Sequence, residues 1–101
     1  MAAGSGYGGK PRPAVIIQDD KFDATNSVTI CMITSQIVQA EHVRPVVVAA
    51  PGNGLRTDSA LMVDKIITVP RAKAGAKTGA LSQADMGRLE QAMLVLLGLA
   101  G

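Results

Sequence analysis

Arg12 and the pair Thr34 and Ser35 are the residues of this sequence whose types best suit chemistry on a charged ligand. An arginine guanidinium stays ionised at any working pH, and its planar fork can bind two phosphate oxygens at once. Threonine and serine hydroxyls can donate a hydrogen bond to another oxygen of the same group. On residue type alone, a surface arginine and a strand-ending threonine are the more common interpretations. Whether these residues form a site therefore depends on their relative position.

Two predicted strands bring these residues together. Residues 14–18 form a short apolar run of branched side chains, and residues 28–33 alternate with the period of a half-buried strand. If these strands pair as an antiparallel hairpin around the polar loop 19–27, the start of the first lies beside the end of the second. Arg12, whose backbone is restricted by a proline on each side, would then meet Thr34 at one rim of the sheet.

The middle of the chain predicts further short strands. Residues 43–49, 58–63 and 66–69 are mostly apolar and read as short strands, and residues 51–54 are typical of a chain reversal. Several short strands at close spacing, separated by Gly and Pro turns, indicate a small barrel or curled sheet.

A C-terminal helix is predicted over residues 82–98. Ser82 is a good N-cap and Gly98 a good helix end. Between them apolar residues recur at helical spacing and are predicted to pack on the barrel: Met86, Leu89, Met93, Leu96 and Leu97. Gly87 costs the helix about 1 kcal/mol relative to alanine. We therefore hypothesise that another backbone approaches the helix closely at Gly87.

Residues 1–10 are Gly-rich and lack periodicity, so a flexible loop is predicted for them. Their glycines match the spacing of a dinucleotide-binding fingerprint, but no strand is predicted before them, so the required context is missing. With Lys10 they also approach a phosphate-binding loop, yet Pro11 stands where that motif needs Ser or Thr. We reject both motifs.

Length and composition limit the class of protein. A chain of 101 residues is expected to form a single domain, residues 1–101, whose modest core would benefit from an oligomer interface. The lone Cys31 excludes an internal disulfide and is predicted to be a buried, inert thiol. We recognise no signal peptide, and the longest apolar run, residues 92–100, is too short to cross a membrane. A soluble, cytoplasmic protein with no membrane partner is expected.

Charge is unevenly distributed, although the net charge is only +2. Residues 65–77 contain basic residues and no acid, whereas aspartates cluster in loop 19–27 and would repel phosphates. On charge alone, the basic run is best interpreted as a solvated face. The sole histidine, His42, is predicted to lie exposed in a loop. The sequence has neither a histidine pair nor a metal-ligand cluster, so we expect no metal and no other cofactor.

The order of several short segments resembles one known family. An Arg-Pro pair enters an apolar strand, a polar loop with Phe22 follows, and the next strand ends in Ile-Thr-Ser at residues 33–35. Later segments fall in the same order and spacing: Gly-Leu-Arg-Thr-Asp-Ser at 54–59, Val-Asp-Lys-Ile at 63–66, Arg-Ala-Lys at 71–73 and Thr-Gly-Ala-Leu at 78–81. Over about residues 10–99 the chain resembles the MazF/PemK endoribonuclease toxins of bacterial toxin-antitoxin pairs.

This resemblance implies a mainly β (α+β) fold, an SH3-like small barrel with a C-terminal helix, assembled as a homodimer. It implies a sequence-selective, metal-independent endoribonuclease that cuts single-stranded RNA through the RNA's own 2′-hydroxyl. It also implies a partner, a cognate antitoxin that lays an acidic tail across the RNA groove. In the family a strand precedes the Gly-rich loop, so here either that strand is missing or another segment takes its place.

Site residues can be carried over from the family position by position. Arg12 and Thr34 match its catalytic arginine and threonine, and Ser35 is adjacent. Some members use an Arg-X-Asp. Met62 replaces that arginine here, which leaves Asp64 as a possible base or RNA contact. The remaining expected RNA contacts are a stacking side chain and two basic residues, namely Tyr7, Lys10 and Lys65.

Two other functions remain open on the sequence alone. A toxin of the related CcdB type has the same fold but binds DNA gyrase and is not an enzyme; it has no need of Arg12 or Thr34. An inactive, truncated domain that only binds its antitoxin is the third possibility. Cleavage of RNA by the folded protein would distinguish the endoribonuclease from both of these alternatives.

Overall fold

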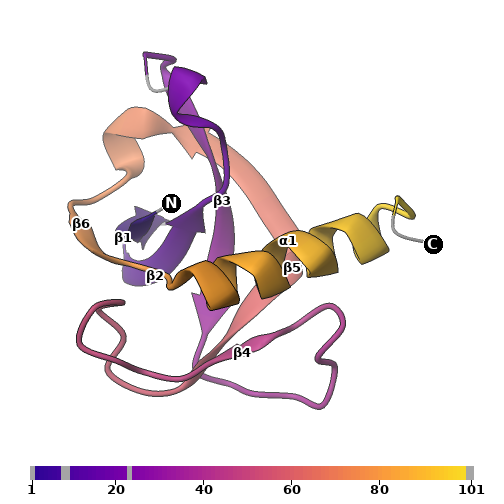
Figure 1. Ribbon diagram of the computed structural model, residues 1–101. Helices are drawn as coiled ribbons and strands as arrows, with labels where there is room; N and C mark the ends of the chain where they lie inside the picture. The colour runs from indigo at the N-terminus through magenta and orange to yellow at the C-terminus, as the bar shows by residue number, and fades with distance from the viewer. Residues whose placement is uncertain (1, 8–9, 23, 100–101) are drawn as a thin grey trace.

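Six strands form one antiparallel sheet in the computed structural model, which describes residues 2–7, 10–22 and 24–99. The strand order is β4-β5-β3-β2-β1-β6, and the sheet curls around one side of the single α-helix (Figure 1). The strands are β1 (Ala2–Tyr7), β2 (Lys10–Ile16), β3 (Ser27–Thr34), β4 (Val46–Val47), β5 (Ser59–Pro70) and β6 (Lys77–Ala80). The helix is α1 (Gln83–Leu96), and two 3-10 turns are η1 (Asp20–Phe22) and η2 (Arg71–Lys73).

The predicted flexible loop over residues 1–10 is wrong for β1 and for the start of β2. Strand β1 pairs with β2, where Ala3 faces Val15, and with β6, where Ala2 faces Ala80. Apart from Tyr7 its residues are small, and they show no alternation, so the sequence carried no strand signal; backbone pairing on both sides makes the strand. In the sheet, β1 lies between β2 and β6, so β2 is not an edge strand.

The predicted hairpin of β2 and β3 is confirmed. Ala14 faces Met32 and Ile16 faces Ile30 in antiparallel register. Arg71 fastens the loop between the strands, because its Nε donates to the carbonyl oxygen of Thr25 at 2.8 Å. Its Nη2 donates to two further carbonyl oxygens of the loop, at 3.3 and 3.4 Å. This member of the basic run is therefore held in a structural contact.

Strand β5 runs unbroken from Ser59 to Pro70, where two strands were predicted. The exposed Asp64 and Lys65 interrupt the apolar pattern, but the pairing with β3 continues past them through a register shift between Cys31 and Ile33. The strand predicted over residues 43–49 shrinks to β4. Pro45 has no backbone N–H to offer a ladder, although its carbonyl oxygen still accepts from the N–H of Leu61 at 2.9 Å.

Helix α1 packs on one face of the sheet and seals the larger of two apolar clusters. Its Leu89 and Ala92 are buried there with Val15, Leu61 and Val63. Residues on the other face of the sheet form the second cluster: Ala14, Val28, Ile30, Met32 and Val69. Cys31 is buried as predicted, and its burial, with a smaller effect of the nearby Asp64 charge, raises the pKa of the thiol to about 12.

The limits of α1 agree closely with the prediction. The Ser82 hydroxyl accepts from the N–H of Asp85 at 3.1 Å as an N-cap, and Gly98, at a φ of 74°, follows the last turn. The predicted packing of Leu96 and Leu97 is wrong, because 46% and 67% of these residues is exposed. Within the described residues, no helix is long and apolar enough to span a membrane.

Candidate functional site

The register of β2 and β3 brings Arg12 and Thr34 together. Ala14 faces Met32, and continuing this register by two residues sets Arg12 opposite Thr34. Both residues line one open cavity of about 610 Å³, which Ser35 also lines. The guanidinium and the two hydroxyls therefore meet at one rim of the sheet, as the hairpin predicted.

The hydroxyl of Thr34 is oriented by its own backbone. Its Oγ1 accepts a hydrogen bond from the N–H of Gln36 at 3.1 Å. With the oxygen occupied as an acceptor, the O–H proton remains available to donate to a ligand oxygen. Arg12 is exposed and has no hydrogen-bond or ion-pair partner among the described residues, so its fork is also available.

Another part of the cavity wall is formed by residues 54–57, and Ser59 and Thr78 also line the cavity. It brings a second cation, Arg56, into the site, and sequence analysis did not single this residue out. The family motif contained Arg56, but no pattern in the sequence showed that this segment lines the same cavity as Arg12. That position depends on how the turn before it is attached to β6.

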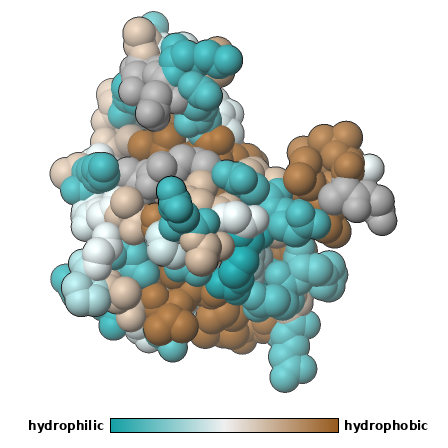
Figure 2. All heavy atoms as spheres, viewed as in Figure 1, coloured by the Kyte–Doolittle hydropathy of each residue, from teal (hydrophilic) through white to brown (hydrophobic). Residues whose placement is uncertain are grey.

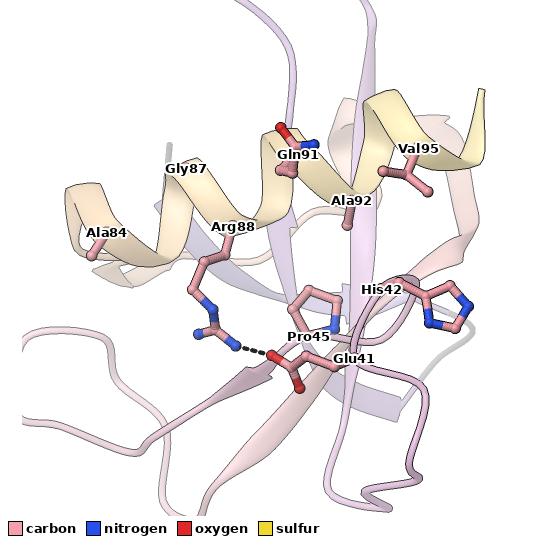
Figure 3. Close-up of a pocket in the computed structure, with 9 residues that line it drawn as sticks. All are labelled: Glu41, His42, Pro45, Ala84, Gly87, Arg88, Gln91, Ala92 and Val95. Atoms are coloured by element: carbon pink, nitrogen blue, oxygen red, sulfur yellow. Dashed lines mark hydrogen bonds and ion pairs between the residues drawn. The ribbon is translucent and has the colours of Figure 1, made fainter. Parts of the chain in front are cut away.

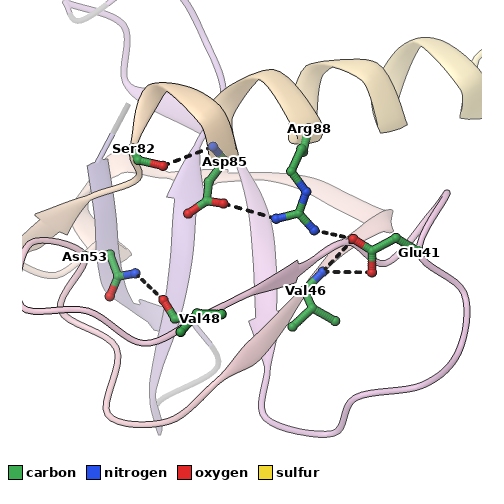
Figure 4. A network of polar contacts seen from close by, with 7 residues as sticks. All are labelled: Glu41, Val46, Val48, Asn53, Ser82, Asp85 and Arg88. Carbon is green, nitrogen blue, oxygen red and sulfur yellow. Dashed lines mark hydrogen bonds and ion pairs between the residues drawn. The ribbon is translucent and has the colours of Figure 1, made fainter.

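Asn53 holds the turn that leads into this wall. Its buried side chain accepts from the N–H groups of Ala50 and Leu55, both at 3.1 Å, and donates to the carbonyl oxygen of Val48 at 2.9 Å (Figure 4). The turn is joined to β6 by the N–H of Ala80, which donates to the Gly52 carbonyl oxygen at 2.9 Å. These hydrogen bonds fix the position of the turn that leads into this part of the cavity wall.

The cavity is positively charged. Its described lining includes two arginines, Arg12 and Arg56, and neither Asp nor Glu. Asp58, the acidic residue nearest to Arg56 in sequence, accepts from the N–H of Ala49 at 2.8 Å through its Oδ1 and does not line the cavity. Such a surface attracts polyanions.

Asp64 lies outside this cavity and has a partner that the sequence did not reveal. Arg44 binds both of its carboxylate oxygens, through Nε at 2.8 Å and Nη2 at 3.0 Å. The hydrogen bond from Arg44 is the main reason why the pKa of Asp64 is lowered. A carboxylate held ionised in this way suits an ion pair more than a general base at neutral pH.

Of the three expected RNA contacts, Lys65 is exposed on β5 and does not line the cavity. The backbones of Tyr7 and Lys10 face each other where β1 turns into β2. Their side chains lie outside the described part of the structure.

Replacing Asp64 with Asn should destabilise the protein by no more than about 1 kcal/mol at pH 7, because the pair is partly exposed. The folded protein lowers the pKa of this carboxyl below its usual value near 3.8, so the stabilisation is present above that pH and is lost as pH falls through the folded pKa. Urea unfolding of both proteins at pH 7 and pH 3 measures this. If the difference in unfolding free energy between the two proteins were larger at pH 3 than at pH 7, a stabilising ion pair would be contradicted.

A second hollow, of about 380 Å³, lies between α1 and the segment before β4 (Figure 3). Arg88 of the helix binds Glu41 across it and also Asp85 at 3.1 Å, while Glu41 accepts from the N–H of Val46 (Figures 3 and 4). His42 lies exposed at its rim, in a loop as predicted. This ion-pair network fastens the loop to the helix, and none of its members lines the cavity of Arg12.

No three His, Cys, Asp or Glu side chains among residues 2–7, 10–22 and 24–99 are grouped so that they could hold a metal ion. The charged and polar side chains that line the cavity of Arg12 are two guanidinium groups and several hydroxyls. Such groups bind phosphate oxygens and stabilise charge on them.

Comparison with known proteins agrees with this geometry. The family described as PemK-like, MazF-like toxin of type II toxin-antitoxin system matches residues 2–97. A protein from Mycolicibacterium smegmatis named Probable endoribonuclease MazF is 48% identical over 100 residues, which cover 99% of this chain and 92% of that protein.

Solved structures share the fold. Mycobacterium tuberculosis toxin MazF-mt6 matches with a TM-score of 0.87 at 22% identity, over 98% of both chains. An endoribonuclease from a mycobacterial species, solved in complex with its cognate antitoxin, matches with a TM-score of 0.78 at 20% identity, over 97% of this chain and 91% of that one. These matches confirm the predicted SH3-like barrel with a C-terminal helix. By its family match and its 48% identical relative, the chain belongs to the PemK-like, MazF-like toxins of type II toxin-antitoxin systems.

Proposed function

We propose that this toxin is an endoribonuclease that cleaves single-stranded RNA at the cavity between Arg12 and Thr34. The observation that carries the proposal is that Arg12, which has no partner among the described residues, and an available hydroxyl line one cavity whose described lining has no carboxylate. Family membership and the relative named an endoribonuclease support it. A gyrase-binding toxin has no use for this pair of side chains.

The reaction is an attack of the RNA's 2′-oxygen on the adjacent phosphorus. The new 2′-O–P bond forms a cyclic phosphate while the bond from phosphorus to the 5′-oxygen breaks. The 2′-hydroxyl loses a proton and the leaving 5′-oxygen gains one. Negative charge rises on the non-bridging oxygens, where the fork of Arg12 binds two oxygens and the Thr34 hydroxyl donates to one. Ser35, exposed beside Thr34, supplies a second hydroxyl at the same rim.

Single strands suit the cavity better than duplexes. RNA sequence is read mainly where unpaired bases can be splayed out and bound on their edges. The cavity is open and its wall carries side-chain hydroxyls and backbone at residues 54–57, which can contact base edges. Sequence-selective cleavage follows from such contacts.

An acidic antitoxin segment would occupy the same cavity, because Arg12 and Arg56 attract carboxylates as they attract phosphates. A mycobacterial structure of this fold contains its cognate antitoxin. Inhibition by such a partner would compete directly with RNA. We expect the toxin and its antitoxin to meet in the cytoplasm.

A homodimer is expected because the end of α1 and the residues just after it carry apolar side chains that are exposed in the single chain: Leu94, Val95, Leu96, Leu97 and Leu99. Figure 2 shows them as a hydrophobic projection at the right of the molecule. A second copy could cover this surface. Sedimentation velocity at micromolar concentration should give the mass of a dimer, and a monomer throughout would contradict this expectation.

The purified protein should cleave a long single-stranded RNA in the presence of EDTA at a few preferred sequences. Products are mapped by primer extension, and a double-stranded RNA of the same sequence is the control. A folded protein that leaves RNA intact and inhibits gyrase would overturn the proposal. Dependence on an added divalent ion would overturn the metal-independent mechanism alone.

A further inference from the structure

We propose that Arg56 binds a second phosphate of the RNA, next to the linkage that is cut at Arg12 and Thr34. This inference rests on the proposed function and deepens it. It makes the substrate a stretch of chain with at least two phosphates in the cavity, and it makes Arg56 a binding residue that sets which linkage reaches Arg12.

The cavity is large enough for more than one phosphate. About 610 Å³ lies within the range of about 300 to 1,000 Å³ that is common for sites of whole small molecules. Arg12 stands on the β2 wall and Arg56 on the wall formed by residues 54–57. Two separate segments therefore each contribute one planar cation to the same cavity.

Arg56 is free to serve this role. It is exposed, lines the cavity, and has no hydrogen-bond or ion-pair partner among the described residues. Asp58, two residues on, is engaged by the N–H of Ala49 at 2.8 Å. The charge of Arg56 is thus left for a ligand, since no carboxylate among the described lining residues neutralises it.

The backbone that carries Arg56 is fixed in advance. The Asn53 amide binds Leu55 immediately before it. Gly54 adopts a φ of 71°, and a Cβ at this position would lie 2.6 Å from the Thr78 carbonyl oxygen. A wall held this closely against β6 loses little backbone entropy when RNA binds.

Loss of Arg56 should weaken binding more than it slows chemistry. A contact made equally in the ground state and the transition state changes KM and leaves kcat nearly unchanged. Each phosphate contact on a single strand contributes about −0.7 to the slope of log affinity against log salt. We therefore expect Arg56→Ala to raise KM about tenfold and to reduce the magnitude of that slope by about 0.7.

The test uses oligoribonucleotides that contain the mapped cleavage sequence, each with one neutral methylphosphonate at a different flanking linkage. Wild type should lose affinity strongly when the methylphosphonate replaces one particular flanking linkage. Arg56→Ala should bind that modified RNA and the native RNA with equal affinity. Affinity is measured by fluorescence anisotropy with a 2′-deoxy residue at the cut, so that nothing is cleaved. Lys21→Ala removes the same charge at the far loop and should behave like wild type.

The outcomes separate this inference from the proposed function. If wild type cuts RNA and Arg56→Ala keeps the wild-type affinity, salt slope and methylphosphonate pattern, the second phosphate site is disproved and the ribonuclease stands. If folded wild type neither binds nor cuts RNA, both are overturned. If Arg56→Lys restores the salt slope with only part of the affinity, the contact is a charge on a phosphate, as proposed.

Discussion

Arg12→Ala is expected to lower kcat/KM for RNA cleavage by about 10³-fold, the loss seen when a group that stabilises transition-state charge is removed. The side chain is exposed and has no partner among the described residues, so the melting temperature should stay within about 2 °C of wild type. Steady-state kinetics on a short RNA and thermal melting of both proteins measure the two quantities. Thr34→Ala should lose less, about 10²-fold.

Two variants control this prediction. Arg12→Lys keeps the charge but lacks the planar fork, so it should recover only part of the activity. Lys21→Ala removes a cation from the loop between β2 and β3, where the Lys21 ammonium lies over the ring of Phe22. This variant should cleave RNA at the wild-type rate. Equal losses in Arg12→Ala and Lys21→Ala would mean that Arg12 contributes only general charge.

Gly79→Ala should destabilise the fold by about 3 kcal/mol, a large part of the stability of a small domain. A Cβ at Gly79 would lie 2.6 Å from the Asn53 carbonyl carbon, 2.8 Å from the Gly52 carbonyl oxygen and 2.9 Å from the Gly54 nitrogen. All three are backbone atoms, so neither β6 nor the turn can adjust by moving a side chain. Urea unfolding measures the loss, and RNA cleavage should fall with it because the Arg56 wall shifts.

Two other glycines are matched controls, because a Cβ at Gly52 or at Gly87 would have nothing within 4 Å. Gly52→Ala lies in the same turn and should be nearly neutral. Gly87→Ala should stabilise the helix by about 0.5 to 1 kcal/mol. Because nothing lies near that Cβ, the hypothesis that another backbone approaches Gly87 is wrong for the described part of the chain. A Gly79→Ala protein as stable as wild type would show that the turn and β6 are not in close contact.

Local pattern was enough to predict the hairpin that builds half of the site. The alternation in residues 28–33 fixes which side chains face the core, and antiparallel pairing then places Arg12 opposite Thr34. The N-cap at Ser82 was likewise visible, because capping depends on residues close in sequence.

The other half depends on contacts between distant segments. Strand β1 consists, apart from Tyr7, of small residues with no alternation and exists through its pairing with β2 and β6. Arg56 enters the cavity because Gly79 lets β6 approach the turn at residues 52–54. The ion pair of Arg44 and Asp64 joins residues that no spacing rule relates. Sequence pattern alone could not supply these long-range contacts.

A single 2′-deoxy substitution tests the central claim most directly. In an oligoribonucleotide cut at one mapped linkage, only the 2′-hydroxyl beside that linkage is replaced by hydrogen. If Arg12 and Thr34 stabilise attack by that hydroxyl, wild type should bind the modified strand with unchanged affinity and fail to cut it. The unmodified strand should end in a 2′,3′-cyclic phosphate or its hydrolysis product. Cleavage of the deoxy strand at the same linkage would show that another nucleophile attacks and would contradict the mechanism.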